Sequence, residues 1–248
     1  MTIPPAGPHA LVDLASDDPS TTAETYQRLL GHEVGTGADG RRVVNLGNVA
    51  LSMRLSAGEP DTHDVYFTVD DITASRRLLG RRGYPLADTV LGALGETSPV
   101  GIAERPESGA AVDGDLTGLD HLVFTCDNRD VAVALFAGTF GLDFRLDQPI
   151  GQDARQLFFR RDDLIVEVVA APRPPADPVP SSPVLLWGVA WRSTDVDTTH
   201  ARLTADGLDL SEVRSGRKKG TRIFTVRHRE LATRTVVIGP DAGADSLQ

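Results

Sequence analysis

Two stretches of the chain decide its fold: Val65-Tyr-Phe-Thr-Val-Asp-Asp-Ile-Thr-Ala-Ser-Arg-Arg-Leu-Leu-Gly-Arg-Arg-Gly83 aligns without a gap on Val189-Ala-Trp-Arg-Ser-Thr-Asp-Val-Asp-Thr-Thr-His-Ala-Arg-Leu-Thr-Ala-Asp-Gly207. In each, an apolar run typical of a strand is followed by an aspartate, Asp71 or Asp195, and then by an amphipathic stretch that a glycine closes. Aspartate caps the start of a helix, and glycine commonly ends one. The pattern predicts a repeated unit of strand and helix.

A second repeat extends this unit to the whole chain. The stretch His9-Ala-Leu-Val-Asp-Leu14 parallels His121-Leu-Val-Phe-Thr-Cys126, and Tyr26-Gln-Arg-Leu-Leu-Gly31 parallels Phe136-Ala-Gly-Thr-Phe-Gly141, with a two-residue difference in spacing. Further strand-like runs follow each helix, at residues 42–46 and 49–55, then 143–146, 156–160 and 164–169, and finally 211–214, 222–227 and 235–238. Residues 88–101 of the second unit are patterned weakly. Each unit therefore reads as βαβββ.

Two linkers divide the four units into pairs. Residues 107–118 are small, acidic and glycine-containing, and residues 172–183 hold six of the 16 prolines. We expect an α+β fold in which four βαβββ modules pair into two cup-shaped domains with mixed sheets. Residues 1–114 would form the first domain and residues 115–248 the second, in which the proline-rich linker 172–183 joins the last two modules.

Composition excludes several classes of protein. The formal net charge of −10 argues against a nucleic acid or an anionic membrane as partner, and no apolar run is long enough to span a bilayer. The start of the chain does not resemble a secretory signal, and the single cysteine, Cys126, fits a reducing compartment, so we expect a cytoplasmic protein. All basic residues except Lys218 and Lys219 are arginines, which suggests a bacterial genome rich in G and C. No phosphate-binding loop, dinucleotide fingerprint or nucleophile elbow is present.

Three motifs carry a resemblance to a known family: Leu119-Asp-His-Leu-Val-Phe124, Leu164-Ile-Val-Glu-Val-Val169, and Trp187-Gly-Val-Ala-Trp191 followed by Asp195-Val-Asp197. With the four βαβββ units, they resemble the vicinal oxygen chelate superfamily, the group of glyoxalases, bleomycin-resistance proteins and extradiol dioxygenases. The resemblance is strong over residues 119–240 and loose over residues 9–106. It implies a cup formed by two paired modules, with a divalent metal inside.

The resemblance also implies metal ligands. In the second pair of modules the family's positions are held by His121 and Glu167, whereas Gly188 and either Thr235 or Val236 stand where two further ligands would be. The implied cofactor is one divalent ion, Fe, Mn, Zn or Ni, or none at all.

The first pair of modules offers an alternative set of ligands. His9 matches His121 and Asp64 matches Gly188, while Glu104 lies near the end of the last strand. A set of His9, Asp64 and Glu104 would suit a divalent metal if all three side chains faced one cavity.

Strand alternation places a second functional group in the second cup. It puts His121, Glu167 and Arg192 on the face turned away from the helices. Such a trio can work without metal, because His or Glu moves a proton and Arg anchors a carboxylate or stabilises an enolate. The other interpretation is a buried ion pair of Arg192 with Glu167. The same alternation assigns Trp187 and Trp191 to core packing.

The most basic segment, residues 214–222, offers Arg214, Arg217 and Lys218 as binders of a substrate carboxylate or phosphate, although its glycines also suit an ordinary hairpin. The leading hypothesis is an enzyme that acts on a small oxygenated metabolite by isomerase, lyase or oxygenase chemistry. The alternative is a metal-free binding protein of the bleomycin-resistance type, which sequesters a drug-like molecule. A small molecule is the expected partner in both, and a homodimer is left open.

Overall fold

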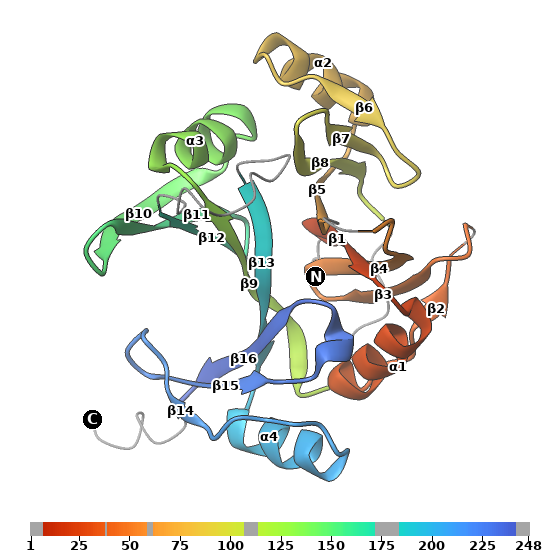
Figure 1. Ribbon diagram of the computed structural model, residues 1–248, viewed down its shortest axis with the longest axis vertical. Coiled ribbons are helices and arrows are strands. Elements are labelled where there is room, and N and C mark those ends of the chain that lie inside the picture. Colours follow the sequence, from red (N-terminus) through yellow and green to blue (C-terminus); the bar gives the residue numbers. More distant parts are fainter. Residues whose placement is uncertain (1–6, 38, 59–61, 107–113, 172–183, 242–248) are drawn as a thin grey trace, which may run out of the picture.

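A computed structural model describes residues 7–37, 39–58, 62–106, 114–171 and 184–241. The first half of the chain forms an eight-stranded mixed sheet with the strand order β2-β3-β4-β1-β5-β8-β7-β6 (Figure 1). Its strands are β1 (Ala10–Ser16), β2 (Gly35–Thr36), β3 (Arg42–Leu46), β4 (Val49–Leu55), β5 (Asp64–Val69), β6 (Leu86–Asp88), β7 (Ala93–Gly95) and β8 (Ser98–Glu104). Its helices are α1 (Pro19–Leu30) and α2 (Ile72–Arg81).

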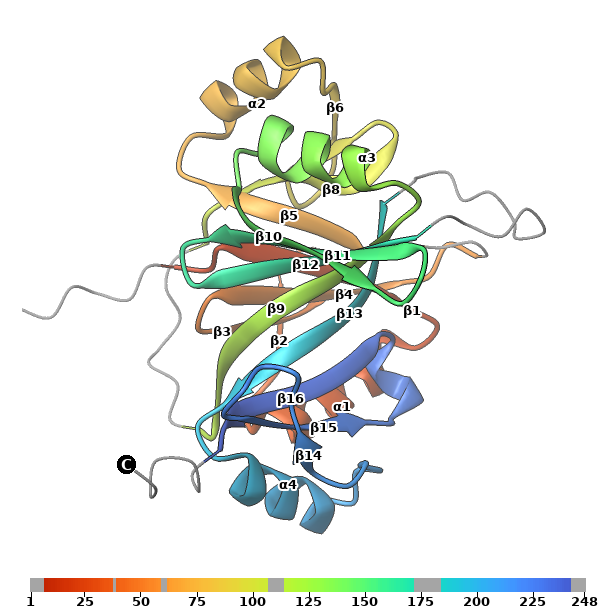
Figure 2. The same cartoon turned by 90° about the vertical axis from the view of Figure 1, so that its left-hand side faces the viewer.

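The second half repeats this arrangement in a sheet of order β10-β11-β12-β9-β13-β16-β15-β14, in which β9 and β13 run side by side across the middle (Figure 2). Its strands are β9 (Leu116–Cys126), β10 (Asp143–Ile150), β11 (Ala154–Arg161), β12 (Leu164–Ala170), β13 (Val184–Ser193), β14 (Arg214–Ser215), β15 (Thr221–Val226) and β16 (Arg234–Pro240). Its helices are α3 (Arg129–Val133), the π-helix η1 (Ala134–Thr139), α4 (Val196–Ala205) and the 3-10 turn η2 (Arg229–Leu231). The predicted α+β fold of four βαβββ modules in two mixed sheets is confirmed.

The helix caps show the repeat in atomic detail. Asp18 accepts hydrogen bonds from two backbone N–H groups at the start of α1, and Asp195 does the same for α4. The Ser16 hydroxyl lies 2.7 Å from that of Thr22, and the Ser193 hydroxyl lies 2.8 Å from that of Thr199. The same side chains therefore fix the strand-to-helix turn in the first and the fourth module.

Several predicted strand limits need correction. Strand β10 extends beyond residue 146 to Ile150, because it remains paired with β11 through Pro149, an edge position where a missing N–H is tolerated. The last part of the fourth module is shifted, since β14 is the short pair Arg214–Ser215. In the second module β6 and β7 are only three residues long, as the weak pattern there indicated.

One apolar core joins the two sheets. Tyr26 of α1 contacts Trp191 of β13 edge to face, and Phe136 of η1 contacts Phe67 of β5, with ring centroids 6.3 Å and 6.4 Å apart. Both helices thus pack between the sheets, whereas α2 and α4 lie at opposite ends of the molecule (Figure 1). One cluster of buried side chains contains residues of both sheets, the first being Ala10 and the last Val237.

The turn between β3 and β4 ties the halves together through Asn48. Its Nδ2 donates to the carbonyl oxygen of Leu119 at 3.0 Å, and its Oδ1 accepts from the Leu119 N–H at 2.9 Å. Gly47, at φ 55°, makes this close approach possible, because a Cβ there would lie 2.1 Å from the Thr117 carbonyl oxygen.

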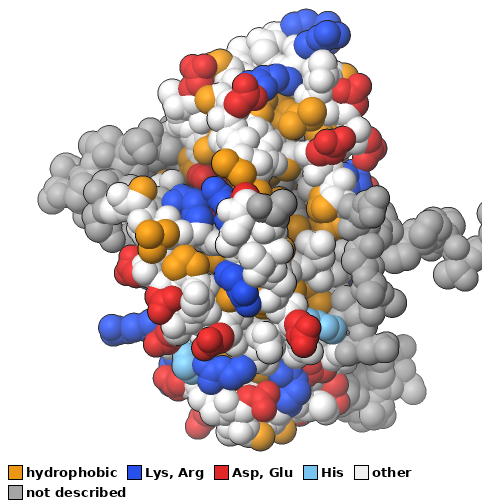
Figure 3. Space-filling model, turned by 90° about the vertical axis from the view of Figure 1, so that its right-hand side faces the viewer, with side chains coloured by type: hydrophobic (Ala, Val, Ile, Leu, Met, Phe, Trp, Pro, Cys, Tyr) orange, Lys and Arg blue, Asp and Glu red, His pale blue; other side chains and the backbone are white. Residues whose placement is uncertain are grey.

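None of the helices in the described ranges is long and apolar enough to cross a membrane. On the face in Figure 3, acidic and basic side chains are interspersed, and the basic ones do not gather into a single patch.

Candidate functional site

The face of the second sheet that is turned away from the helices, called here the cup face, carries a cavity of about 960 Å³. Along β9 the side chains of Leu122 and Phe124 belong to the core, so Val123 and Thr125 lie on the cup face, where they form part of the cavity wall. The remaining walls come from β13, β14, β15, β16, the η2 turn and His63, which precedes β5 of the first half.

The cavity is cationic and partly apolar. Four arginines and two histidines line it, and its lining includes no Asp or Glu; the basic residues are Arg214, Arg227, Arg229, Arg234, His63 and His228. The guanidinium carbon of Arg234 lies 4.6 Å from the ring centroid of Trp187, which is 46% exposed. Several cations beside an exposed aromatic ring suit a small organic anion.

Trp187 corrects a prediction made from the sequence. Strict alternation assigns it to the core together with Trp191, but only Trp191 is buried there. The pairing of β13 with β9 shifts register between Leu186 and Gly188, and this bulge adds a residue that turns Trp187 into the cavity.

The structure brings His121 and Glu167 together on the cup face, directly beside the cavity. Glu167 is the cross-strand neighbour of Val123 in the cavity wall, and its Oε2 lies 3.6 Å from Nε2 of His121. Gln156 donates to Oε1 of Glu167 at 2.6 Å, and Gln148 donates to Gln156 at 2.8 Å. Both members of the pair are largely buried, at 16% and 14% side-chain exposure for His121 and Glu167.

Asp120 sets the tautomer of His121. Its Oδ1 lies 2.8 Å from Nδ1 of His121, so Nδ1 carries the hydrogen and Nε2 faces Glu167. Burial raises the pKa of Asp120, but the hydrogen bond from His121 and the charges of His121, Arg192 and Lys218 outweigh it and hold the pKa below its ordinary value. Asp120 is therefore a carboxylate that keeps this tautomer in place.

Arg192 does not join the pair. Its Nη2 donates to the carbonyl oxygens of Leu119 and Asp163, at 3.0 Å and 3.1 Å, and its Nη1 lies 3.3 Å from the Asp163 carboxylate. The guanidinium is thus directed to the turn between β11 and β12 and makes no ion pair with Glu167. Among the predicted substrate binders, Arg214 lines the cavity, whereas Arg217 and Lys218 are exposed in the β14–β15 hairpin.

The donor set of the second cup does not fit a metal held by three protein ligands. His121 and Glu167 supply two donors, while Gly188 has no side chain, and a Cβ at that position would lie 2.8 Å from the Arg234 carbonyl oxygen. Thr235 is buried and donates its hydroxyl to the Thr233 carbonyl oxygen. The described part of the chain contains no group of three or more His, Cys, Asp or Glu side chains arranged to hold a metal ion.

The first sheet does not assemble His9, Asp64 and Glu104. Glu104 is paired with Val69 at one end of the β5–β8 ladder, whereas Asp64 begins β5 at the other end. His9 is turned toward the second half of the chain, with its Nδ1 3.3 Å from Asp162 and its Nε2 3.3 Å from Asp163.

Strand register explains why His9 and His121 take different places. Both β4 and β12 follow a two-residue turn, so Ser52 of β4 corresponds to Glu167 of β12. Asp13 lies opposite Ser52, and Val123 lies opposite Glu167, so Asp13 corresponds to Val123. Leu11, two residues after His9, therefore occupies the place of His121.

The cup face of the first sheet is filled by its own charges. Asp13 is 1% exposed, and its Oδ2 contacts the guanidinium groups of Arg41 and Arg54. Arg54 also lies 3.7 Å from the Asp64 carboxylate. The two arginines thus compensate the buried charge of Asp13 on this face.

Comparisons with known proteins bear on the class of protein. Residues 120–225 match the sequence model of the Glyoxalase/Bleomycin resistance protein/Dioxygenase superfamily. No curated protein sequence matches the chain.

Among solved structures, a variant of 4-hydroxymandelate synthase from Streptomyces coelicolor is 13% identical, with a TM-score of 0.64 over 96% of this chain and 93% of that one. A xylose isomerase-like TIM barrel/4-hydroxyphenylpyruvate dioxygenase fusion protein is also 13% identical, with a TM-score of 0.65 over 98% of this chain and 51% of that one. Methylmalonyl-CoA epimerase from Mycobacterium tuberculosis is 18% identical, with a TM-score of 0.43 over 54% of this chain and 95% of that one.

The fold and the matched region together define a cup-forming protein built from paired βαβββ modules. Residues 120–225 carry the sequence pattern of this superfamily, as the resemblance predicted, and the whole chain shares its fold of two sheets and four modules with the 4-hydroxymandelate synthase variant.

Sequence reasoning missed most of the cavity wall. Arg227, Arg229 and His228 follow β15, and Arg234 begins β16, but nothing in their spacing indicates that the η2 turn bends them toward Trp187. The density of basic residues between positions 214 and 234 was the available signal.

Proposed function

We propose that this chain is an enzyme that binds a small oxygenated organic acid in the cavity of the second sheet and moves a proton on it with His121 and Glu167. The proposal rests above all on one observation, the cationic cavity with its exposed tryptophan beside a buried His–Glu pair. Removing a proton next to a carbonyl or carboxylate produces an enolate, and this step is common to isomerase and lyase chemistry.

The residues have separable roles in this step. Asp120 holds His121 with Nε2 available, and Gln156 holds Glu167 through Oε1. Oε2 of Glu167 accepts the proton from the substrate carbon while the C–H electron pair enters the enolate, and Nε2 of His121, 3.6 Å away, takes up this proton and returns it when the enolate is reprotonated. The arginines of the cavity wall anchor the substrate carboxylate, and their charge stabilises the enolate oxygen as it forms. Trp187 and Val123 add apolar surface against which the body of the substrate packs.

Hydrogen–deuterium exchange tests the proposal without knowledge of the product. The protein is incubated in D₂O with small 2-oxo acids, 2-hydroxy acids and aryl acetates, and the loss of the C–H signal next to the carbonyl or carboxylate is followed by NMR. We expect catalysed exchange of at least one acid, reduced on the order of 100-fold or more by Glu167→Gln and by His121→Asn.

Glu212→Gln removes an exposed carboxylate and serves as the matched control, with exchange unchanged. Exchange that survives in both site variants, or no exchange with any acid, would rule out the proton-transfer role.

A metal-free binding protein is the second candidate. It is favoured by Gly188, which leaves no room for the family's ligand at that position. In that case equilibrium dialysis would show an acid bound tightly by the wild type and weakly by Arg214→Ala, while His121→Asn would bind it as well as the wild type and no exchange would occur.

A further inference from the structure

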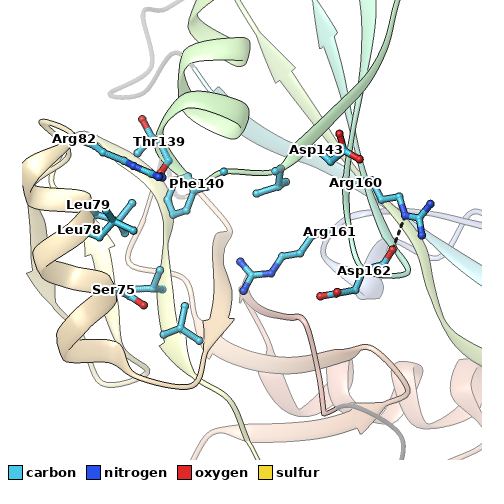
Figure 4. A pocket seen from close by; sticks show the side chains of 14 residues that line it. Ser75, Leu78, Leu79, Arg82, Thr139, Phe140, Asp143, Arg160, Arg161 and Asp162 are labelled. Atoms are coloured by element: carbon cyan, nitrogen blue, oxygen red, sulfur yellow. Dashed lines mark hydrogen bonds between the residues drawn. The ribbon is translucent and has the colours of Figure 1, made fainter.

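A second pocket, of about 380 Å³, lies between the halves of the chain and shares no residue with the cup-face cavity. Helix α2 of the first half forms one wall, and the end of η1, the start of β10 and the end of β11 form the other (Figure 4). Arg82, which directly follows α2, donates to the Thr139 carbonyl oxygen of the other wall, so the two walls are held together.

Arg161 places a charged guanidinium in this pocket. Its guanidinium points into the space in front of Ser75 and Leu79 (Figure 4). It donates to the Thr68 carbonyl oxygen and lies 5.5 Å from the ring centroid of Phe67, but within the described ranges it forms no ion pair. Burial, with the nearby charge of Arg105, lowers the pKa of Arg161 and outweighs the opposite effect of the Asp162 and Asp70 carboxylates.

The carboxylates around the pocket have other partners. Asp162 contacts His9 at 3.3 Å, and Asp143 accepts a hydrogen bond from Arg145 at 2.7 Å. Asp70 accepts one from Arg105 at 2.8 Å. A half-buried guanidinium with unused N–H donors therefore faces a space large enough for a small molecule.

The remaining walls are apolar, since Leu79, Phe140, Val69 and Ile102 line the pocket beside Arg161. A ligand that fits both the guanidinium and the apolar walls has one carboxylate and a compact apolar body. A guanidinium binds a carboxylate through two parallel hydrogen bonds.

We propose that this pocket is a second binding site, for a small apolar carboxylic acid, with the carboxylate on Arg161 and the apolar body against Leu79 and Phe140. Bound there, the acid contacts both halves of the chain, and it stabilises the folded protein according to its concentration.

Benzoate is a suitable probe, and benzyl alcohol is its neutral control. We expect benzoate to raise the Tm of the wild type saturably and benzyl alcohol to have no such effect. Arg161→Met should abolish the benzoate response and leave the free protein at least as stable as the wild type, because a buried unpaired charge has been removed. Arg77→Met, on α2 but exposed and outside the pocket lining, should respond as the wild type does.

Two further variants keep the test decisive. Ser75→Glu supplies an internal carboxylate, so it should raise the Tm of the free protein and remove the benzoate response even if Arg161→Met fails to fold. Arg214→Met alters the cup-face cavity and should leave the response intact. A response that persists in Arg161→Met or in Ser75→Glu, or that is lost in Arg214→Met, would overturn the proposal and assign the benzoate to another site.

Discussion

Asn48 should be one of the most stabilising polar side chains in the protein, and its replacement gives a quantitative test of how the halves are joined. In Asn48→Ala the Leu119 N–H loses its hydrogen-bond partner in a buried place, which costs about 1–3 kcal/mol. The Leu119 carbonyl oxygen loses one of two donors but retains Arg192, which adds about 1 kcal/mol.

The sum is about 3 kcal/mol, which for a chain of this size corresponds to a fall of roughly 6–12 °C in Tm. Urea unfolding followed by circular dichroism measures the free energy directly. Asn45→Ala removes an exposed asparagine from the same hairpin and should change stability by less than about 0.5 kcal/mol. A loss of less than about 0.5 kcal/mol in Asn48→Ala would refute the reasoning.

A third variant at this position separates hydrogen bonding from charge. Asn48→Asp keeps the acceptor for Leu119 but places a carboxylate where Nδ2 lies 3.2 Å from the Asp163 carboxylate. Repulsion raises the pKa of the new group in the folded state, so this variant should be less destabilised at pH 4 than at pH 7.

Three further predictions follow from buried titratable groups. The protein has three tyrosines, and burial raises the pKa of each, to about 12 for Tyr66 and Tyr84. Absorbance at 295 nm should therefore show no tyrosinate near pH 10 in the folded protein but a full titration step near pH 10 in urea. Since the unfolded chain loses these protons first, stability should fall as pH rises from 10 to 12, and a native step near pH 10 would contradict this. Burial raises the pKa of Asp115, but the hydrogen bonds from Arg202 outweigh this effect, so the pKa is lowered. The Asp115–Arg202 pair therefore stabilises the folded protein at neutral pH, and this contribution is lost as pH falls through the lowered pKa of Asp115. Arg202→Lys should therefore cost about 1–2 kcal/mol at pH 7 and less at pH 3, measured by urea unfolding, whereas an equal loss at both pH values would contradict the pairing. Burial also raises the pKa of the Cys126 thiol, so a disulfide reagent should label it slowly in the folded protein at pH 8 and rapidly in urea, and equal rates would show that the strand end is open.

Local patterns predicted most of the fold, because each module is determined by contacts between neighbouring residues. The aspartates at positions 71 and 195 cap α2 and α4 as their place in the repeat indicated. The alternation that put His121 and Glu167 on one face needed only the strand period, and the structure places these side chains 3.6 Å apart.

Features that depend on distant or irregular contacts could not be predicted in this way. The bulge that turns Trp187 outward adds a single residue to β13, and no residue type marks it. The contacts of His9 with Asp162 and Asp163 join residues from different halves, so the docking of the sheets determines them. Arg192 lies on the predicted strand, but its ion pair with Asp163, a residue of a distant turn, could not be predicted from the strand pattern.

The position of the cavity relative to the shared core has a consequence for how this protein can change. Its cationic residues Arg214, Arg227 and Arg234 are exposed, and they contribute little to the buried cluster that joins the sheets. Substitutions there alter what the cavity recognises at small cost in folding free energy, because surface changes away from the core usually shift stability by less than about 0.5 kcal/mol. Laboratory evolution of new ligand selectivity should therefore tolerate many simultaneous changes in this wall, while Tyr26 and Trp191 remain fixed.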